Sequence, residues 1–201
     1  MLSLFGGDIK ASLAERRQSP YFPSMTPSPQ PDVGSLILIG MPGAGKSTAG
    51  PILARRTGRP FLDCDTLLAE REKRGLQEIV DGDGYLALRA IEERLLLSLP
   101  AGRYVIATGG SAVYSDRAMR HLKTLGPVIW LRLHLEELAS RIDNFAGRGL
   151  AKRPDQSLAD LYAERLPLYQ RYADATVDCD GLSPEQVVAQ ILRLVHISEK
   201  N

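Results

Sequence analysis

A phosphate-binding loop is indicated by the eight residues GMPGAGKS at positions 40–47. The loop follows a short apolar run and opens a helical pattern, which is the context that this motif requires. Its glycines let successive backbone N–H groups point at one cluster of oxyanions, and the N-terminus of the helix adds its dipole. Lys46 can then reach the β- and γ-phosphates of a nucleotide, and the Ser47 hydroxyl can bind Mg²⁺.

Two carboxylates, Asp63 and Asp65, follow the next apolar run. In an extended segment residues i and i+2 point the same way, so both could enter one site. One could hold Mg²⁺ through water while the other accepts a hydrogen bond from an attacking hydroxyl group. Asp65 would also make a good N-cap for a helix over residues 66–74, and the two roles are compatible.

The elements that must position these residues alternate along the chain. Strands are predicted by apolar runs at residues 35–39, 60–62, 104–107, 128–133 and 176–179. Helical periodicity covers residues 46–56, 66–74, 85–99, 116–125, 135–142, 158–172 and 184–195. Near-continuous apolar strands separated by helices predict a three-layer α/β/α sandwich with a central five-stranded parallel sheet. In such a sheet the carboxyl ends of the strands face the ligand crevice.

Composition excludes several classes of protein. The 201 residues carry a formal net charge of +1, which argues against a nucleic-acid binder with a basic face. No apolar run approaches the ~18 residues of a membrane helix, so we expect no membrane partner. Cys64 and Cys179 fit neither a disulfide framework nor a metal knuckle, which predicts a reducing, cytoplasmic location.

The chain divides into two parts. Residues 1–33 include a stretch rich in proline and serine and are predicted to be a disordered N-terminal extension. Residues 34–197 are predicted to form one P-loop domain. The sequence has no Asn-Lys-x-Asp motif, which argues against a GTPase.

Five motifs in register give the chain a specific resemblance. They are the loop at 40–47, DCD at 63–65, LRAIE at 88–92, TGGS at 108–111 and ERLPLY at 164–169. Arg89 stands 24 positions after Asp65, and Gly109 stands 20 positions after Arg89. Over about residues 35–195 the chain resembles the shikimate kinases, which are P-loop enzymes of the nucleoside-monophosphate-kinase type.

The resemblance implies roles for single residues. Asp65 would hold the acceptor hydroxyl groups and assist deprotonation, and Arg89 and Arg165 would grip the substrate carboxylate with their planar guanidinium groups. The implied catalytic residues are Asp65, Lys46 and Arg148. The implied nucleotide-binding residues are Gly43, Ala44, Gly45, Lys46, Ser47, Thr48, Arg141 and Arg148. The implied substrate-binding residues are Asp65, Arg89, Gly109, Gly110, Ser111 and Arg165. The implied metal ligands are Ser47 and Asp63.

A mobile lid is expected at about residues 143–157, where basic residues outnumber acidic ones and apolar periodicity is weak. In the family's pattern Arg141 would stack on adenine and Arg148 would neutralise charge on the transferring phosphoryl group. Closure of the lid would exclude water, which otherwise competes for the phosphoryl group.

Two features depart from the family's pattern. Ser111 stands where the family usually has a third glycine, and the lid lacks the usual Pro-Leu after its key arginine. The predicted function is therefore ATP- and Mg²⁺-dependent phosphorylation of a small hydroxy acid, in the first place shikimate to shikimate 3-phosphate. Another hydroxylated carboxylate such as homoserine, or a non-catalytic nucleotide-binding module, stays open. A monomer is expected from the resemblance.

Overall fold

Strand β1 (Leu36–Ile39) lies at the centre of a five-stranded parallel sheet with the order β2-β3-β1-β4-β5. In a computed structural model, residues 34–141 and 149–198 are described, and all of them belong to the unit Val33–Asn201. The other strands are β2 (Phe61–Asp63), β3 (Val105–Ala107), β4 (Val128–Arg132) and β5 (Ala175–Asp178). All four pairings are parallel, as the near-continuous apolar runs predict.

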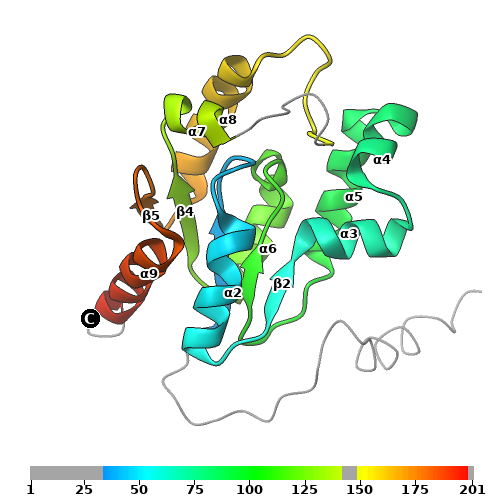
Figure 1. Ribbon diagram of the computed structural model, residues 1–201. Coiled ribbons are helices and arrows are strands. Elements are labelled where there is room, and N and C mark those ends of the chain that lie inside the picture. The colour runs from blue at the N-terminus through cyan, green and yellow to red at the C-terminus, as the bar shows by residue number, and fades with distance from the viewer. Residues whose placement is uncertain (1–33, 142–148, 199–201) are drawn as a thin grey trace, which may run out of the picture. The chain divides into compact units, whose positions relative to one another are not determined.

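Helices connect the strands and cover the sheet (Figure 1). Their bounds are α2 (Lys46–Thr57), α3 (Cys64–Glu72), α4 (Leu76–Asp83), α5 (Tyr85–Leu97), α6 (Asp116–Leu125), α7 (Leu135–Arg141), α8 (Leu158–Tyr172) and α9 (Pro184–Ser198), with a short 3₁₀ turn η2 (Ala112–Tyr114). Helices α2 and α9 pack on one side of the sheet and α6 lies on the other. This arrangement confirms the predicted three-layer sandwich.

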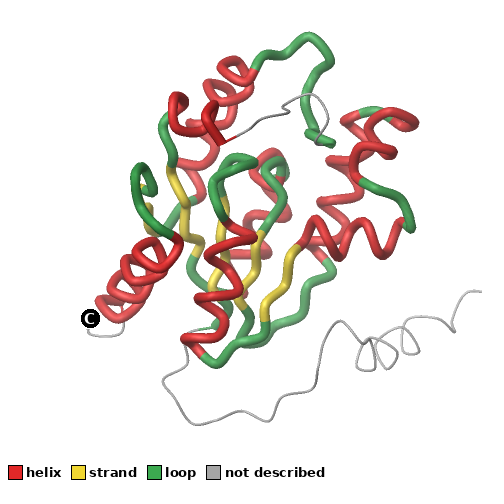
Figure 2. Tube along the Cα trace, in the orientation of Figure 1, coloured by secondary structure: helices red, strands yellow, loops and turns green. Residues whose placement is uncertain are grey.

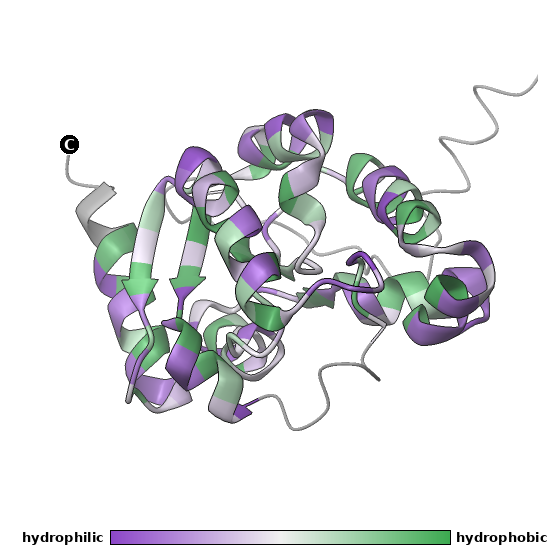
Figure 3. Cartoon of the chain, turned by 90° about the horizontal axis from the view of Figure 1, so that it is seen from above, coloured by the Kyte–Doolittle hydropathy of each residue, from purple (hydrophilic) through white to green (hydrophobic). Residues whose placement is uncertain are grey.

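Figure 3 shows the hydropathy of each residue along the chain, and most of the buried residues are apolar. All four residues of β1 are at most 1% exposed, which is expected for a central strand covered on both faces. Among the described residues, no helix combines the length and the apolar character needed to cross a membrane.

The structure corrects several predicted boundaries. Helix α4 was not predicted, because residues 75–84 contain three glycines, although Leu76, Ile79 and Val80 stand at helical spacing. Helix α3 begins at Cys64 rather than at residue 66, because the Asp63 side chain accepts hydrogen bonds from the Asp65 and Thr66 amides. Asp63 is therefore the N-cap, and the prediction that Asp65 caps this helix is wrong. Residues 1–33, predicted to be disordered, and 142–148 of the predicted lid lie outside the described residues.

The carboxyl ends of β1, β2 and β3 meet at one edge of the sheet, where loops gather (Figure 2). Strand β1 has β3 as its neighbour on one side and β4 on the other, so the strand order reverses at β1. A topological switch of this kind is where open α/β sheets bind ligands. The fold thus assembles the predicted motifs around the end of β1.

Helix α2 packs so closely on β2 that a glycine is needed between them. A Cβ atom on Gly50 would lie 2.8 Å from Cζ of the Phe61 ring and closer still to its Cε2. We predict that Gly50→Ala lowers the free energy of unfolding by about 1 kcal/mol, because overpacking costs about 1–3 kcal/mol and outweighs the ~1 kcal/mol that alanine gains in a helix. Urea denaturation measures the change.

The double variant Gly50→Ala/Phe61→Leu is the control, since a smaller side chain removes the collision and leaves the helical gain. Stabilisation by Gly50→Ala alone would contradict the tight packing of α2 on β2.

Candidate functional site

The phosphate loop leaves β1 and turns into α2 through glycines in the left-handed region. Gly43 has φ 85° and Gly45, the N-cap of α2, has φ 90°, a conformation that favours glycine. The Lys46 side chain folds back over the loop, and its Nζ donates to the carbonyl oxygens of Gly40 at 2.7 Å and Met41 at 3.0 Å. Burial lowers the pKa of Lys46 to about 8, while the nearby Asp65 opposes this shift.

One cavity of about 410 Å³ brings most of the predicted residues together. Its lining includes the predicted nucleotide-binding residues Gly43, Gly45, Lys46, Ser47, Thr48 and Arg141. Its lining also includes the predicted acceptor residues Asp65, Gly110, Ser111 and Arg165. Asp63, Ala44, Gly109 and Arg89 do not line this cavity, and Arg148 lies outside the described residues. Residues from the loop, α3, α5 and α8 thus surround one space.

A smaller cavity of about 180 Å³ lies against the phosphate loop. Ala44, Gly45, Thr48 and Arg141 line it, opposite Cys179 and the apolar residues that follow it. The Arg141 guanidinium is fixed by Glu137, whose carboxylate lies 2.8 Å from its Nη2. A flat guanidinium beside an apolar wall is suited to a planar ring.

Asp65 lies in the first turn of α3 and lines the large cavity together with Lys46. The extended i, i+2 geometry expected for Asp63 and Asp65 is wrong, because the helix has already begun at Cys64. Asp63 is occupied as the cap, whereas Asp65 is turned toward the cavity. Burial raises the pKa of Asp65, and the Lys46 ammonium counteracts part of that rise.

Arg89 of α5 and Arg165 of α8 converge on a single oxygen atom. Their Nη2 atoms donate to the backbone carbonyl of Ala151 at 3.0 Å and 3.1 Å. Arg165 is 1% exposed, and its Nη1 is buried without a hydrogen-bond partner among the described residues. Two guanidinium groups that reach one oxygen, with a donor to spare, form an anion-binding arrangement.

The glycines at the end of β3 are required by close approach. A Cβ atom on Gly109 would lie 2.7 Å from Asp65 Oδ1, and one on Gly110 would lie 2.8 Å from Arg165 Nη1. A Cβ atom at either position would therefore displace an acidic or a basic side chain of the cavity.

Glu92 is a site residue to which sequence reasoning assigned no role. It is 4% exposed, accepts a hydrogen bond from the Ser111 hydroxyl, and its Oε1 has no partner among the described residues. Burial and the nearby Asp65 raise the pKa of Glu92 to about 7, although the Ser111 hydrogen bond works against the shift. The sequence does contain a signal that could have revealed Glu92: its carboxylate stands among Leu88, Ile91 and Leu95 on the apolar face of a helix.

Comparisons with known proteins identify the family that this chain resembles. The family model described as shikimate kinase matches residues 42–196. A shikimate kinase from Pseudomonas aeruginosa is 38% identical over 161 residues, covering 79% of this chain and 94% of the relative. One from Thermodesulfovibrio yellowstonii is 33% identical over 162 residues, covering 79% and 93%. The solved shikimate kinase from Acinetobacter baumannii in complex with shikimate superposes with a TM-score of 0.76 at 29% identity, covering 84% of this chain and 96% of that one.

The buried Glu92 predicts a pH dependence of stability. Its pKa in the folded protein, about 7, lies above the ordinary value of 4.5, so the folded state holds this proton more tightly than the unfolded state. The stability that Glu92 contributes is complete below pH 4.5 and is lost as the pH rises through about 7. We predict that Glu92→Gln, which cannot ionise, gains up to about 3 kcal/mol over the wild type across this range.

Thermal denaturation of both proteins between pH 4 and 8.5 measures this difference. Glu70→Gln, which alters an exposed glutamate of α3, is the matched control. A difference between Glu92→Gln and wild type that does not change with pH would contradict the buried, protonated carboxyl.

Proposed function

The chain belongs to the shikimate kinase family, and from this premise we propose that the cavity beside the phosphate loop transfers the γ-phosphoryl group of ATP to a hydroxyl group of shikimate. The proposal rests on one observation: groups suited to bind phosphate and groups suited to bind the acceptor line the same cavity. Lys46 and the glycine loop stand at one side, and Asp65 and the buried Arg165 line the same space.

The nucleotide would bind with its phosphates on the loop, where α2 directs free amides and its dipole at the anion. Lys46 would exchange its carbonyl partners, Gly40 and Met41, for phosphate oxygens. The adenine ring would occupy the smaller cavity beside Arg141. Arg148 would approach the phosphates from the lid, which is carried over from the resemblance alone.

Shikimate would bind with its carboxylate toward Arg89 and Arg165 and with its reacting hydroxyl toward Asp65. Nη1 of Arg165, which has no hydrogen-bond partner among the described residues, supports this orientation. A buried donor without an acceptor costs free energy, and an anionic ligand that accepts its hydrogen bond would recover that cost. Asp65 would accept the hydroxyl proton as the oxygen attacks the γ-phosphorus. Catalysis would rest on positioning and charge stabilisation, as is general for phosphoryl transfer.

Mg²⁺ would be held by the Ser47 hydroxyl and, through water, by Asp63. The residues fit, because Ser47 lies exposed in the first turn of α2 and the two helix amides engage only Oδ1 of Asp63. Mg²⁺ usually keeps several waters and is bound through one or two protein groups together with substrate phosphates, so a hydroxyl and one carboxylate are an adequate set of protein ligands. When bound, Mg²⁺ would neutralise charge on the β- and γ-phosphate oxygens.

The proposed setting is the cytoplasm, supported by Cys64 and Cys179, which are both free and buried. The protein is proposed to act as a monomer without nucleic-acid or membrane partners.

Lys46→Ala should reduce kcat by roughly a hundredfold or more with any acceptor, because the phosphates lose the one charged group that cradles them in the loop. A coupled ADP assay with Mg-ATP and shikimate measures turnover. Lys123→Ala, which removes an exposed lysine of α6, is the control. Near-normal turnover by Lys46→Ala would refute the proposed phosphate site.

Arg89→Ala should raise the KM for shikimate about ten- to hundredfold and leave the KM for ATP nearly unchanged, since charge-assisted hydrogen bonds are worth about 1.5–3 kcal/mol. Arg117→Ala removes an exposed arginine of α6 that pairs with Glu93 of α5, the helix that carries Arg89, and serves as the control. The assay includes homoserine beside shikimate as acceptor. An effect of Arg89→Ala on ATP alone, or turnover of homoserine in place of shikimate, would argue against the assignment.

A further inference from the structure

We propose that Tyr114 is a positioning residue that holds Arg89 and Arg165 in the geometry that grips the acceptor carboxylate. This inference rests on the proposed function, and it deepens the acceptor side of that site. Tyr114 is the last residue of η2, three positions after Ser111, and no motif of the sequence assigns it a role.

The Tyr114 ring contacts both arginines. The guanidinium carbon of Arg89 lies 3.5 Å from the ring centroid, and that of Arg165 lies 5.3 Å from it. Nε of Arg165 also donates to the Tyr114 hydroxyl at 3.4 Å. One aromatic side chain therefore sets where each of two cations from different helices can lie.

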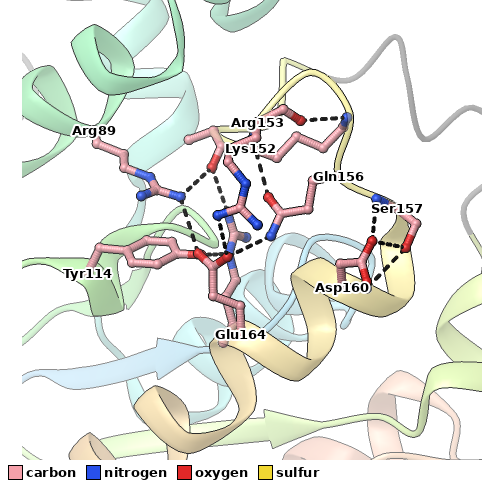
Figure 4. A network of polar contacts seen from close by, with 10 residues as sticks. Arg89, Tyr114, Lys152, Arg153, Gln156, Ser157, Asp160 and Glu164 are labelled. Carbon is pink, nitrogen blue, oxygen red and sulfur yellow. Dashed lines mark hydrogen bonds and ion pairs between the residues drawn. The ribbon is translucent and has the colours of Figure 1, made fainter.

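The Tyr114 hydroxyl is fixed in turn by Glu164 of α8 (Figure 4). Burial is the main cause that raises the pKa of Tyr114, so the hydroxyl stays protonated and donates to Glu164 Oε1. Glu164 also receives Arg153 at 3.1 Å and Gln156 at 2.7 Å, and lies 3.8 Å from Nη2 of Arg89. The phenol thus connects the arginine pair to a carboxylate that is anchored at several points.

Such a support is needed because Arg89 and Arg165 carry like charges and donate to the same carbonyl oxygen. Burial and the neighbouring Arg165 both lower the pKa of Arg89, whereas Tyr114 favours its charged form. The electron-rich face of an aromatic ring attracts a cation without offering a full negative charge. The ring can therefore keep two cations close together and leave them available to a substrate carboxylate.

The test compares Tyr114→Phe, which keeps the ring, with Tyr114→Leu, which removes it. We expect Tyr114→Leu to raise the KM for shikimate roughly tenfold and Tyr114→Phe to raise it about threefold, with the KM for ATP within twofold of wild type in both. Tyr172→Phe is the matched control, because it removes another phenol that donates to a carboxylate, Asp116 at 3.0 Å.

A second readout separates positioning from general damage. Methyl shikimate lacks the anionic carboxylate, so Tyr114→Leu should lower the preference for shikimate over the methyl ester by a similar factor. An unchanged KM for shikimate in Tyr114→Leu, or an equal loss for shikimate, its ester and ATP, would overturn the positioning role. Wild-type protein that neither binds shikimate by calorimetry nor phosphorylates it would instead overturn the proposed function, and this inference with it.

Discussion

The site depends on three buried or partly buried cations that donate to neutral carbonyl groups. Lys46 donates to the carbonyl oxygens of Gly40 and Met41, and Arg89 and Arg165 both donate to that of Ala151. Burying charge is costly, and peptide dipoles offset only part of that cost. Each end of the cavity can therefore still attract an anion, and under the proposed function these anions would be a phosphate at one end and a carboxylate at the other. A site compensated fully by carboxylates would lose that attraction.

Parallel strand order makes this arrangement possible. The loop after β1, the aspartates at the end of β2 and the glycines after β3 lie on adjacent strands whose carboxyl ends share one edge. Arg89 and Arg165 come from helices α5 and α8, far apart in sequence, and they reach the same point because η2 packs against both helices. The two glycines after β3 allow Asp65 and Arg165 to approach the backbone within distances that any side chain would block.

Local patterns predicted the parts of the structure that local chemistry determines. The phosphate loop and helices α6 and α8 are readable from residue spacing because glycine conformation and helical periodicity act over a few residues. The capping role of Asp63 was assigned to Asp65, since the choice depends on where α3 leaves the strand. The sequence assigned no role to Tyr114 or Glu92, because their contacts are with residues of other elements. Tyr114 contacts Arg89 and Arg165, and Glu92 accepts a hydrogen bond from Ser111.

Two buried acids in one cavity raise the question of which one can act as the base. Glu92 lies among apolar residues of α5, and its pKa of about 7 means that this carboxyl is ionised only in part near neutral pH. Burial also raises the pKa of Asp65. The Lys46 ammonium is the strongest charge acting on this carboxyl group, and it favours the ionised form. Where the surroundings give two carboxyl groups different pKa values, the two groups can take different acid–base roles. Under the proposed function Asp65 would therefore be the carboxylate that accepts the proton, while Glu92, bonded to Ser111 and ionised only in part, would repel the incoming phosphates less than a fully ionised carboxylate.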